Sequence, residues 1–127
     1  ITPNIGYWTH TKPGVLQRYL DSLAQLKAYD VRVGFPGHKW LIRDWQQRIV
    51  EMLVHHDERL TTTYEAVQQT AGVSANGVSQ AVFRLGELNV HQSSFAIAET
   101  LAHLDSLEGS NAIQREEVDG VWRFSVV

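Results

Sequence analysis

The last sixteen residues, AIQREEVDGVWRFSVV, constrain the fold of this chain more than any other stretch. They form two runs of alternating side chains on either side of Asp119-Gly120. An Asp-Gly pair between two such runs is the strongest short-range signal for a two-residue β-hairpin turn. The sequence therefore predicts a C-terminal hairpin over residues 112–127.

Three helices are predicted ahead of this hairpin, and the first two have signals at both ends. A long helix begins after Asp44, its expected N-cap, and its apolar stripe continues to Gly72, a suitable C-terminal stop. A short helix follows, with Ser74 as its expected cap and Gly86 as its expected end. Both helices are therefore predicted with defined boundaries.

The third helix is predicted over FAIAETLAHLDSLEG, residues 95–109, after the loop ELNVHQSS. Its apolar residues recur at helical spacing, and Ser94 is its expected cap. Three helices followed by a β-hairpin is the order of a winged helix-turn-helix. Residues 45–127 are therefore predicted to form a winged-helix domain, mostly helical with a C-terminal hairpin, and the chain is assigned to the α+β class.

The first 44 residues carry different signals. Residues 1–10 read as an irregular segment or a short strand, and an amphipathic helix is predicted from Val15, with Thr11 as its N-cap. The run YDVRVGF, residues 29–35, predicts a β-branched strand. Because a lone strand is not stable, residues 1–44 are interpreted as the C-terminal remnant of an α/β domain whose other strands are absent.

Composition narrows the function classes. The net charge is −3, whereas nucleic-acid binders usually present a basic face. The absence of cysteine excludes disulfides and cysteine-ligated zinc. No apolar run approaches the roughly 20 residues needed to span a bilayer, and no signal peptide is visible, so a cytoplasmic protein is predicted. The chain starts at Ile1 without a methionine, which predicts that it is a processed or truncated piece of a longer parent.

One histidine has the position expected of a ligand. His38 follows Pro36-Gly37 at the carboxyl end of the predicted strand, where α/β proteins tend to place ligands and chemistry. The competing interpretation is a loop histidine without a ligand role. Trp8 and Trp40 flank this loop; packing between the two domains is their predicted use, with a substrate channel as the alternative.

The other histidine and acidic residues are weaker candidates for a metal or catalytic site. His55 and His56 are adjacent on a helix, so their side chains point about 100° apart and form no paired site by themselves. His56 lies on the apolar stripe and is predicted in the core or an interface, with His55 solvated. Glu99 and His103 are four positions apart on a helix and could share a metal, but this spacing is common by chance.

Six motifs follow one another along the chain: ITPNI, YLDSL, FPGH, IRDW, HHDER and AETLAHLDSL. Together they resemble the C-terminal part of metallo-β-lactamase-fold hydrolases. The Pro-Gly-His element alone is a weak signal, whereas the ordered combination is much more specific and covers essentially the whole chain. The similarity is greatest to the subgroup with a winged-helix tail, which includes β-lactamase-like protein 2.

The resemblance implies an αββα sandwich with one or two zinc ions that hydrolyses an ester, thioester, lactone or phosphodiester. In that family most ligands belong to an upstream His-x-His-x-Asp-His motif, a later histidine and a bridging aspartate. The last histidine ligand follows Pro-Gly, and His38 matches it by position. The other ligands are not in this sequence, and a catalytic zinc needs about three protein ligands. The chain alone is therefore expected to be inactive and to hold no zinc tightly.

The resemblance and the pattern of charged and apolar residues also predict the partners of this chain. A small molecule or RNA is the expected substrate of the parent. The third predicted helix carries Glu99, Asp105 and Glu108 but no lysine or arginine, so its face would repel duplex DNA. The apolar face of residues 15–29 needs cover from the winged helix or from a second copy, which predicts a homodimer or a rearranged N-terminal segment. The alternative function is a non-catalytic winged-helix module for protein association or nucleic-acid binding.

Overall fold

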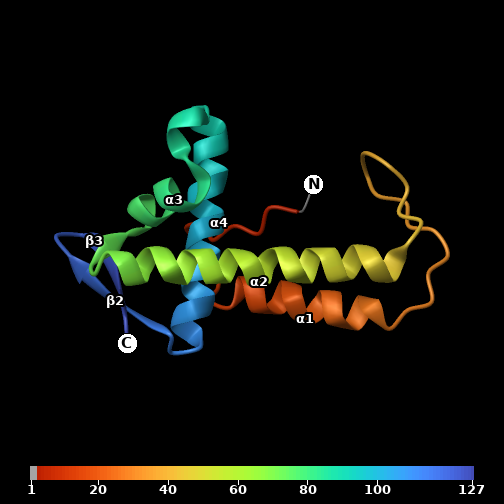
Figure 1. The fold of residues 1–127 in the computed structure, drawn as a ribbon, viewed down its shortest axis with the longest axis horizontal. Coiled ribbons are helices and arrows are strands. Elements are labelled where there is room, and N and C mark those ends of the chain that lie inside the picture. The colour runs from red at the N-terminus through yellow and green to blue at the C-terminus, as the bar shows by residue number, and fades with distance from the viewer. Residues whose placement is uncertain (1–2) are drawn as a thin grey trace.

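The computed structural model describes residues 3–127; Ile1 and Thr2, which open the ITPNI motif and the predicted 1–44 unit, lie outside the described residues. The described part is a mixed α and β fold of four α-helices, one 3₁₀ helix and a three-stranded antiparallel sheet (Figure 1). In chain order the elements are α1 (Val15–Lys27), α2 (Trp45–Gln69), β1 (Val73–Ser74), α3 (Ala75–Phe83), η1 (Leu85–Glu87), α4 (Val90–Gly109), β2 (Ile113–Val118) and β3 (Val121–Val126).

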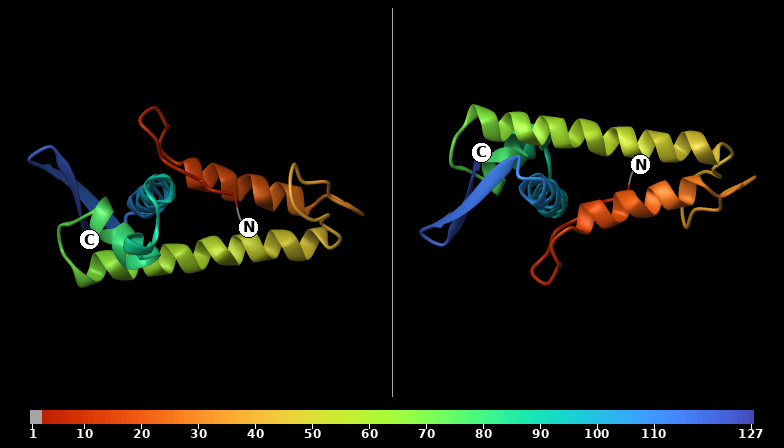
Figure 2. Two further views of the ribbon diagram at one scale, coloured as in Figure 1. Left: turned by 90° about the horizontal axis from the view of Figure 1, so that it is seen from above. Right: turned by 90° about the horizontal axis from the view of Figure 1, so that it is seen from below.

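Helices α1 and α2 lie side by side and antiparallel, and α4 crosses α2 steeply near the start of α1 (Figures 1 and 2). The sheet lies at the C-terminal end of α2. The loop of residues 28–44 lies at the opposite end of the molecule (Figure 1). The long helix α2 therefore connects two separate regions, one built around the sheet and one around the loop.

The predicted hairpin is confirmed with its predicted turn. Strands β2 and β3 pair antiparallel, with Val118 opposite Val121 next to the turn. Asp119 and Gly120 both have positive φ, 51° and 75°, as a type I′ turn requires. Strand β3 is central, because β1 pairs with its other edge and gives the order β1-β3-β2.

The apolar core joins the sheet to three helices. Its fully buried members come from α2, α3, α4 and both long strands: Val67, Val78, Leu104, Ile113 and Phe124. The inward-facing side chains of the hairpin pack on the helices, so the hairpin and the helical layer stabilise each other.

Two of the predicted helix caps are confirmed. The Asp44 carboxylate accepts a hydrogen bond of 2.9 Å from the backbone N–H of Gln47, and α2 begins at the next residue, Trp45. The Ser74 hydroxyl accepts one of 3.2 Å from Gly77 at the start of α3. Each cap satisfies one of the backbone donors that a helix leaves free in its first turn.

Replacing Asp44 with alanine should lower the free energy of unfolding by about 1 kcal/mol, because the first turn of α2 loses its side-chain acceptor. Urea unfolding followed by circular dichroism measures the change. Asp30→Ala is the matched control, since Asp30 is an exposed loop residue outside any helix. Equal stability of the two variants would show that this cap contributes nothing.

Two other predicted caps are wrong. The Thr11 hydroxyl accepts from the backbone of Trp8, and α1 begins after Gly14, whose φ of 81° is left-handed. Ser94 lies inside α4, which starts at Val90, five residues before the predicted start of this helix. Asn89 caps α4 in a capping box, since its side chain accepts from Gln92 N and the Gln92 side chain accepts from Asn89 N. The loop predicted before this helix is thus partly its first turn.

The C-terminal ends of α2 and α3 lie a few residues before the predicted glycines. Helix α2 ends at Gln69, three residues before Gly72, whose φ is 71°. Helix α3 ends at Phe83, and Arg84 rather than Gly86 takes the left-handed conformation at its C-terminus, with φ of 51°. An arginine in this conformation is uncommon, which is why the glycine was the expected stop.

The strand predicted over residues 29–35 is wrong. This segment is irregular, and its single β contact is an isolated antiparallel bridge between Gly34 and Ile42. A β-branched run becomes a strand only where a neighbour supplies the ladder of hydrogen bonds. No such neighbour lies beside this segment within residues 3–127.

Helix α1 is covered within the molecule. Leu16 and Leu23 are buried, and α1 packs against both α2 and α4. Further along the stripe, Leu26 and Tyr29 remain 41% and 64% exposed. Most of the face that seemed to require a second copy is therefore covered by other helices of the same chain.

The N-terminal segment is irregular and is fastened to α4. Tyr7 N donates to the Ala98 carbonyl at 2.9 Å, and the Asn4 amide donates to the Phe95 carbonyl at 3.3 Å. Further on, Gly14 N donates to the Asp105 carboxylate at 2.7 Å. These bonds link residues about ninety positions apart in the sequence and hold the segment across α4.

Candidate functional site

The loop that presents His38 is closed at its base. Gly34 N donates to the Ile42 carbonyl at 2.8 Å, and Ile42 N donates back to Gly34 at 3.0 Å. A β-carbon on residue 34 would lie 3.1 Å from Ile42 Cβ. The two backbone segments can approach this closely because residue 34 is glycine. The seven residues between them form an outward-projecting loop at the end of α1 and α2 (Figure 1).

The tip of this loop is exposed and locally strained. His38 is exposed, and the next residue, Lys39, has φ of 72° in the left-handed region. Phe35 and Trp40, on either side, are 82% and 88% exposed. The predicted packing of Trp40 between two units is therefore not found in the described structure. Trp8, by contrast, lies against the Phe95 ring of α4 at 5.7 Å.

His38 does not belong to a preformed metal site in the part of the chain that the structure describes. Within the described residues 3–127, no group of three or more histidine, aspartate or glutamate side chains is placed to hold a metal ion. These residues therefore do not fit a complete zinc site, and His38 can contribute only a single imidazole nitrogen to one.

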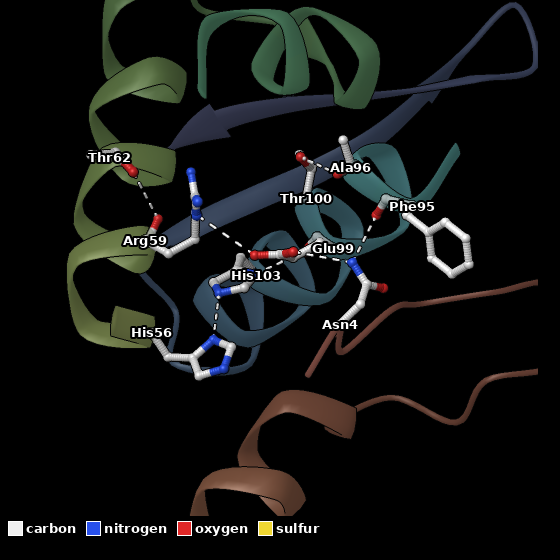
Figure 3. A network of polar contacts seen from close by, with 9 residues as sticks. All are labelled: Asn4, His56, Arg59, Thr62, Phe95, Ala96, Glu99, Thr100 and His103. Carbon is white, nitrogen blue, oxygen red and sulfur yellow. Dashed lines mark hydrogen bonds and ion pairs between the residues drawn. The ribbon is translucent and has the colours of Figure 1, made fainter. Parts of the chain in front are cut away.

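Glu99 and His103 do not form the metal pair that their spacing allowed. The Glu99 carboxylate faces Arg59 Nε at 3.6 Å and accepts from the Asn4 amide at 3.1 Å (Figure 3). His103 Nδ1 instead donates to the backbone carbonyl of Glu99 at 2.8 Å. The two side chains therefore bind different partners.

Arg59, Glu99 and Asn4 form a polar network that connects α2, α4 and the N-terminal segment. The Arg59 guanidinium also lies 4.2 Å above the Phe83 ring of α3. Burial raises the pKa of Glu99, while Arg59 and the Asn4 hydrogen bond act in the opposite direction. The sequence gives no signal for this network, because Asn4 and Glu99 are 95 positions apart.

His56 and His103 form a buried pair between α2 and α4. Their rings are 1% and 0% exposed, and His56 Nδ1 lies 3.2 Å from His103 Nε2 (Figure 3). Burial lowers the pKa of both residues to about 4, so both are neutral at pH 7. The predicted core position of His56 is confirmed. His55 is only partly exposed, with its ring 5.2 Å from that of His56.

A groove of about 620 Å³ lies between the N-terminal segment, α4 and β3. It is lined by Tyr7, Trp8, Thr9, Ser94, Ile97, Ala98, Leu101 and Trp122. The lining is aromatic and aliphatic, with a few hydroxyl groups and no charged side chain. Two of the lining residues, Trp8 and Trp122, are 47% and 38% exposed.

No helix within residues 3–127 is long and apolar enough to cross a membrane.

Comparison with known proteins gives a consistent result for both sequence and structure. Residues 60–127 match the family described as metallo-β-lactamase-like, C-terminal domain. A β-lactamase domain protein from Burkholderia ambifaria superposes with a TM-score of 0.89 at 31% identity, over 98% of this chain and 37% of its own. A metallo-β-lactamase family protein from Thermus thermophilus gives 0.85 at 31% identity, over 100% of this chain and 38% of its own. No curated protein matches the chain. The chain thus spans less than two fifths of the length of these two structures.

Proposed function

The chain belongs to the metallo-β-lactamase-like family, whose C-terminal domain it carries, and from this membership we propose that it is the C-terminal part of a zinc-dependent hydrolase. The observation that carries the proposal is the likeness to a β-lactamase domain protein and a metallo-β-lactamase family protein, over at least 98% of this chain and less than two fifths of theirs. The reaction is hydrolysis of an ester, thioester, lactone or phosphodiester, and the substrate is a small molecule or RNA.

In this proposal His38 is one zinc ligand, and the other ligands belong to the longer protein. Its exposed position at the tip of a loop closed by the Gly34–Ile42 bridge supports this role. So does the left-handed conformation of Lys39, because strained backbone often occurs at functional sites. Zinc, as one or two ions, would lower the pKa of bound water and generate hydroxide at neutral pH. The neutral imidazole of His38 would supply one lone pair.

We propose that residues 1–44 are the end of the metallo-β-lactamase-fold domain and that residues 45–127 are a winged-helix domain. The element order from α2 to β3 and the sheet order β1-β3-β2 support the winged helix. On this proposal the protein belongs to the subgroup with a winged-helix tail. A cytoplasmic location and a homodimer through residues 15–29 stay predictions.

A second candidate is a non-catalytic module for protein association. The groove that contains Trp8 and Trp122 favours it, since aromatic side chains are enriched in protein interfaces. Helix α4 argues against duplex DNA as the partner, because it has no lysine or arginine to contact phosphates.

Zinc content of two purified proteins tests the proposal. The longer protein should contain at least one zinc per chain and hydrolyse a member of a panel of thioesters, lactones and phosphodiesters. The 127-residue chain should bind zinc weakly and hydrolyse none of them, because it supplies one ligand where a catalytic site needs about three. Tight stoichiometric zinc in the short chain, or a metal-free longer protein, would contradict it.

A further inference from the structure

We propose that the His56–His103 pair is an acid-sensitive contact between two helices. It holds α4 against α2 at neutral pH, and the packing of the two helices loosens when the solution is acidified. It does not depend on the proposed hydrolytic function, because neither residue belongs to the His38 loop.

Three helices meet at this pair. His56 comes from α2 and His103 from α4, and the Tyr19 ring of α1 lies edge-on to His56 with ring centroids 5.5 Å apart. The two imidazoles are stacked, with centroids 5.4 Å apart and an angle of 24° between the rings. Any change in the charge of this pair therefore acts on the packing of all three helices.

The hydrogen bonds determine where the protons are. The Glu99 carbonyl can only accept, so His103 Nδ1 carries the proton of that 2.8 Å bond. In a neutral imidazole the other nitrogen is then an acceptor, so His103 Nε2 accepts the proton of His56 Nδ1 at 3.2 Å. His56 Nε2 is left as a bare lone pair, buried and without a hydrogen-bond partner.

A further proton can enter this arrangement only at His56 Nε2. The other three ring nitrogens already donate or accept a hydrogen bond. The product is an imidazolium whose new N–H is buried without an acceptor, next to a ring that is also buried. Both the buried charge and the unpaired donor favour conformations in which the two helices separate and water reaches the rings.

The charged groups around the pair do not compensate this added charge. On α2, Arg59 and His55 are positioned to oppose a positive charge on either ring. On α4, the Glu99 carboxylate faces Arg59 (Figure 3), and the Asp105 carboxylate accepts a hydrogen bond from Gly14 N.

The groups from the remaining elements do not compensate it either. On α1, Tyr19 directs its hydroxyl to Met52 Sδ at 3.5 Å. The N-terminal segment contributes Asn4, a neutral amide that is bonded to Glu99. The lowered pKa of both histidines, to about 4, agrees with this geometry.

The expected pH range follows from proton linkage. An unfolded histidine titrates near 6.5, whereas these two retain their neutral form until about pH 4 in the folded chain. Between these values the unfolded state binds more protons, so stability is full above pH 6.5 and is lost as the pH falls. The unfolding equilibrium constant should rise up to about 10-fold per pH unit for each histidine.

Urea unfolding of the full chain at pH 6 and pH 5 tests the proposal. The wild type should lose more stability over this step than a His56→Leu/His103→Leu double variant, by up to about 100-fold in the unfolding constant for the two histidines together. The control is His91→Asn, which removes an exposed histidine at the start of α4 and should keep the wild-type pH dependence. Parallel curves for the wild type and the double variant would overturn the proposal.

A measurement on the unmodified chain keeps the proposal testable if the double variant fails to fold. The ring ¹H–¹³C signals of His56 and His103 should stay at neutral-imidazole shifts down to pH 5, and then change together with the loss of α2–α4 contacts in nuclear Overhauser spectra. Titration of both rings near pH 6.5 with the helix contacts intact would overturn the proposal.

Discussion

Replacing His38 with alanine in the longer protein should lower its zinc content and its kcat together, with a loss of activity of about 100-fold or more. Removal of groups that merely orient a metal ligand typically costs 10- to 100-fold in affinity or activity, so loss of a ligand itself should cost at least as much. Zinc analysis of the purified variant and its steady-state kinetics measure both quantities. The fold should be unchanged, since His38 is exposed at a loop tip.

The matched control for this experiment is His91→Ala. His91 is also an exposed histidine, but it lies in the first turn of α4, where its ring contacts that of Phe95 at 4.8 Å. This variant should retain zinc and activity. Full activity and full zinc in His38→Ala would remove this residue from the metal site, whereas equal losses in both variants would indicate a general effect of histidine removal.

Replacing Phe124 with alanine should have the largest effect on stability, a loss of about 3–5 kcal/mol in the free energy of unfolding. Phe124 is 2% exposed on the central strand and belongs to the cluster that joins α2, α3, α4 and the hairpin. Truncation removes buried apolar surface and leaves a cavity that the surrounding elements fill only partly. Urea unfolding of the two proteins at pH 7 measures the difference.

Phe35→Ala is the control of the same chemical type, since Phe35 is 82% exposed. Its effect on stability should be within about 0.5 kcal/mol. A loss below about 1 kcal/mol for Phe124→Ala would mean that the sheet is not packed on the helices as described. A large loss for Phe35→Ala would mean that the His38 loop is covered in solution, for example by a second copy of the chain.

The elements that the sequence predicts correctly have signals within a few residues. The Asp119-Gly120 turn needs only its two positive φ angles, and the Asp44 and Ser74 caps need only a backbone donor three residues later. The missed cap of α4 has a local signal too, because Asn89 and Gln92 have capping-box spacing. The serine five residues further on was a plausible cap by residue type, but it had no unsatisfied helix terminus to bind.

The strand predicted over residues 29–35 shows the limit of local reasoning. Its β-branched residues describe a preference, and the ladder of hydrogen bonds depends on a partner that this sequence does not supply. The polar contacts of the interior could not be predicted from the sequence either. The His56–His103 pair spans 47 positions, and no local pattern distinguishes it from two unrelated helix residues. The exposure of His38, in contrast, agrees with its position after Pro-Gly.

The hydrogen bonds that fasten the N-terminal segment to α4 have a consequence for the order of folding. Tyr7 and Asn4 find their partners on a helix that starts at Val90, so these contacts close loops of about ninety residues. Closing such long loops costs entropy before any contact forms, which slows this step relative to the formation of the helices and the hairpin. During synthesis Asn4 and Tyr7 can therefore form these bonds only after α4 has left the ribosomal exit tunnel.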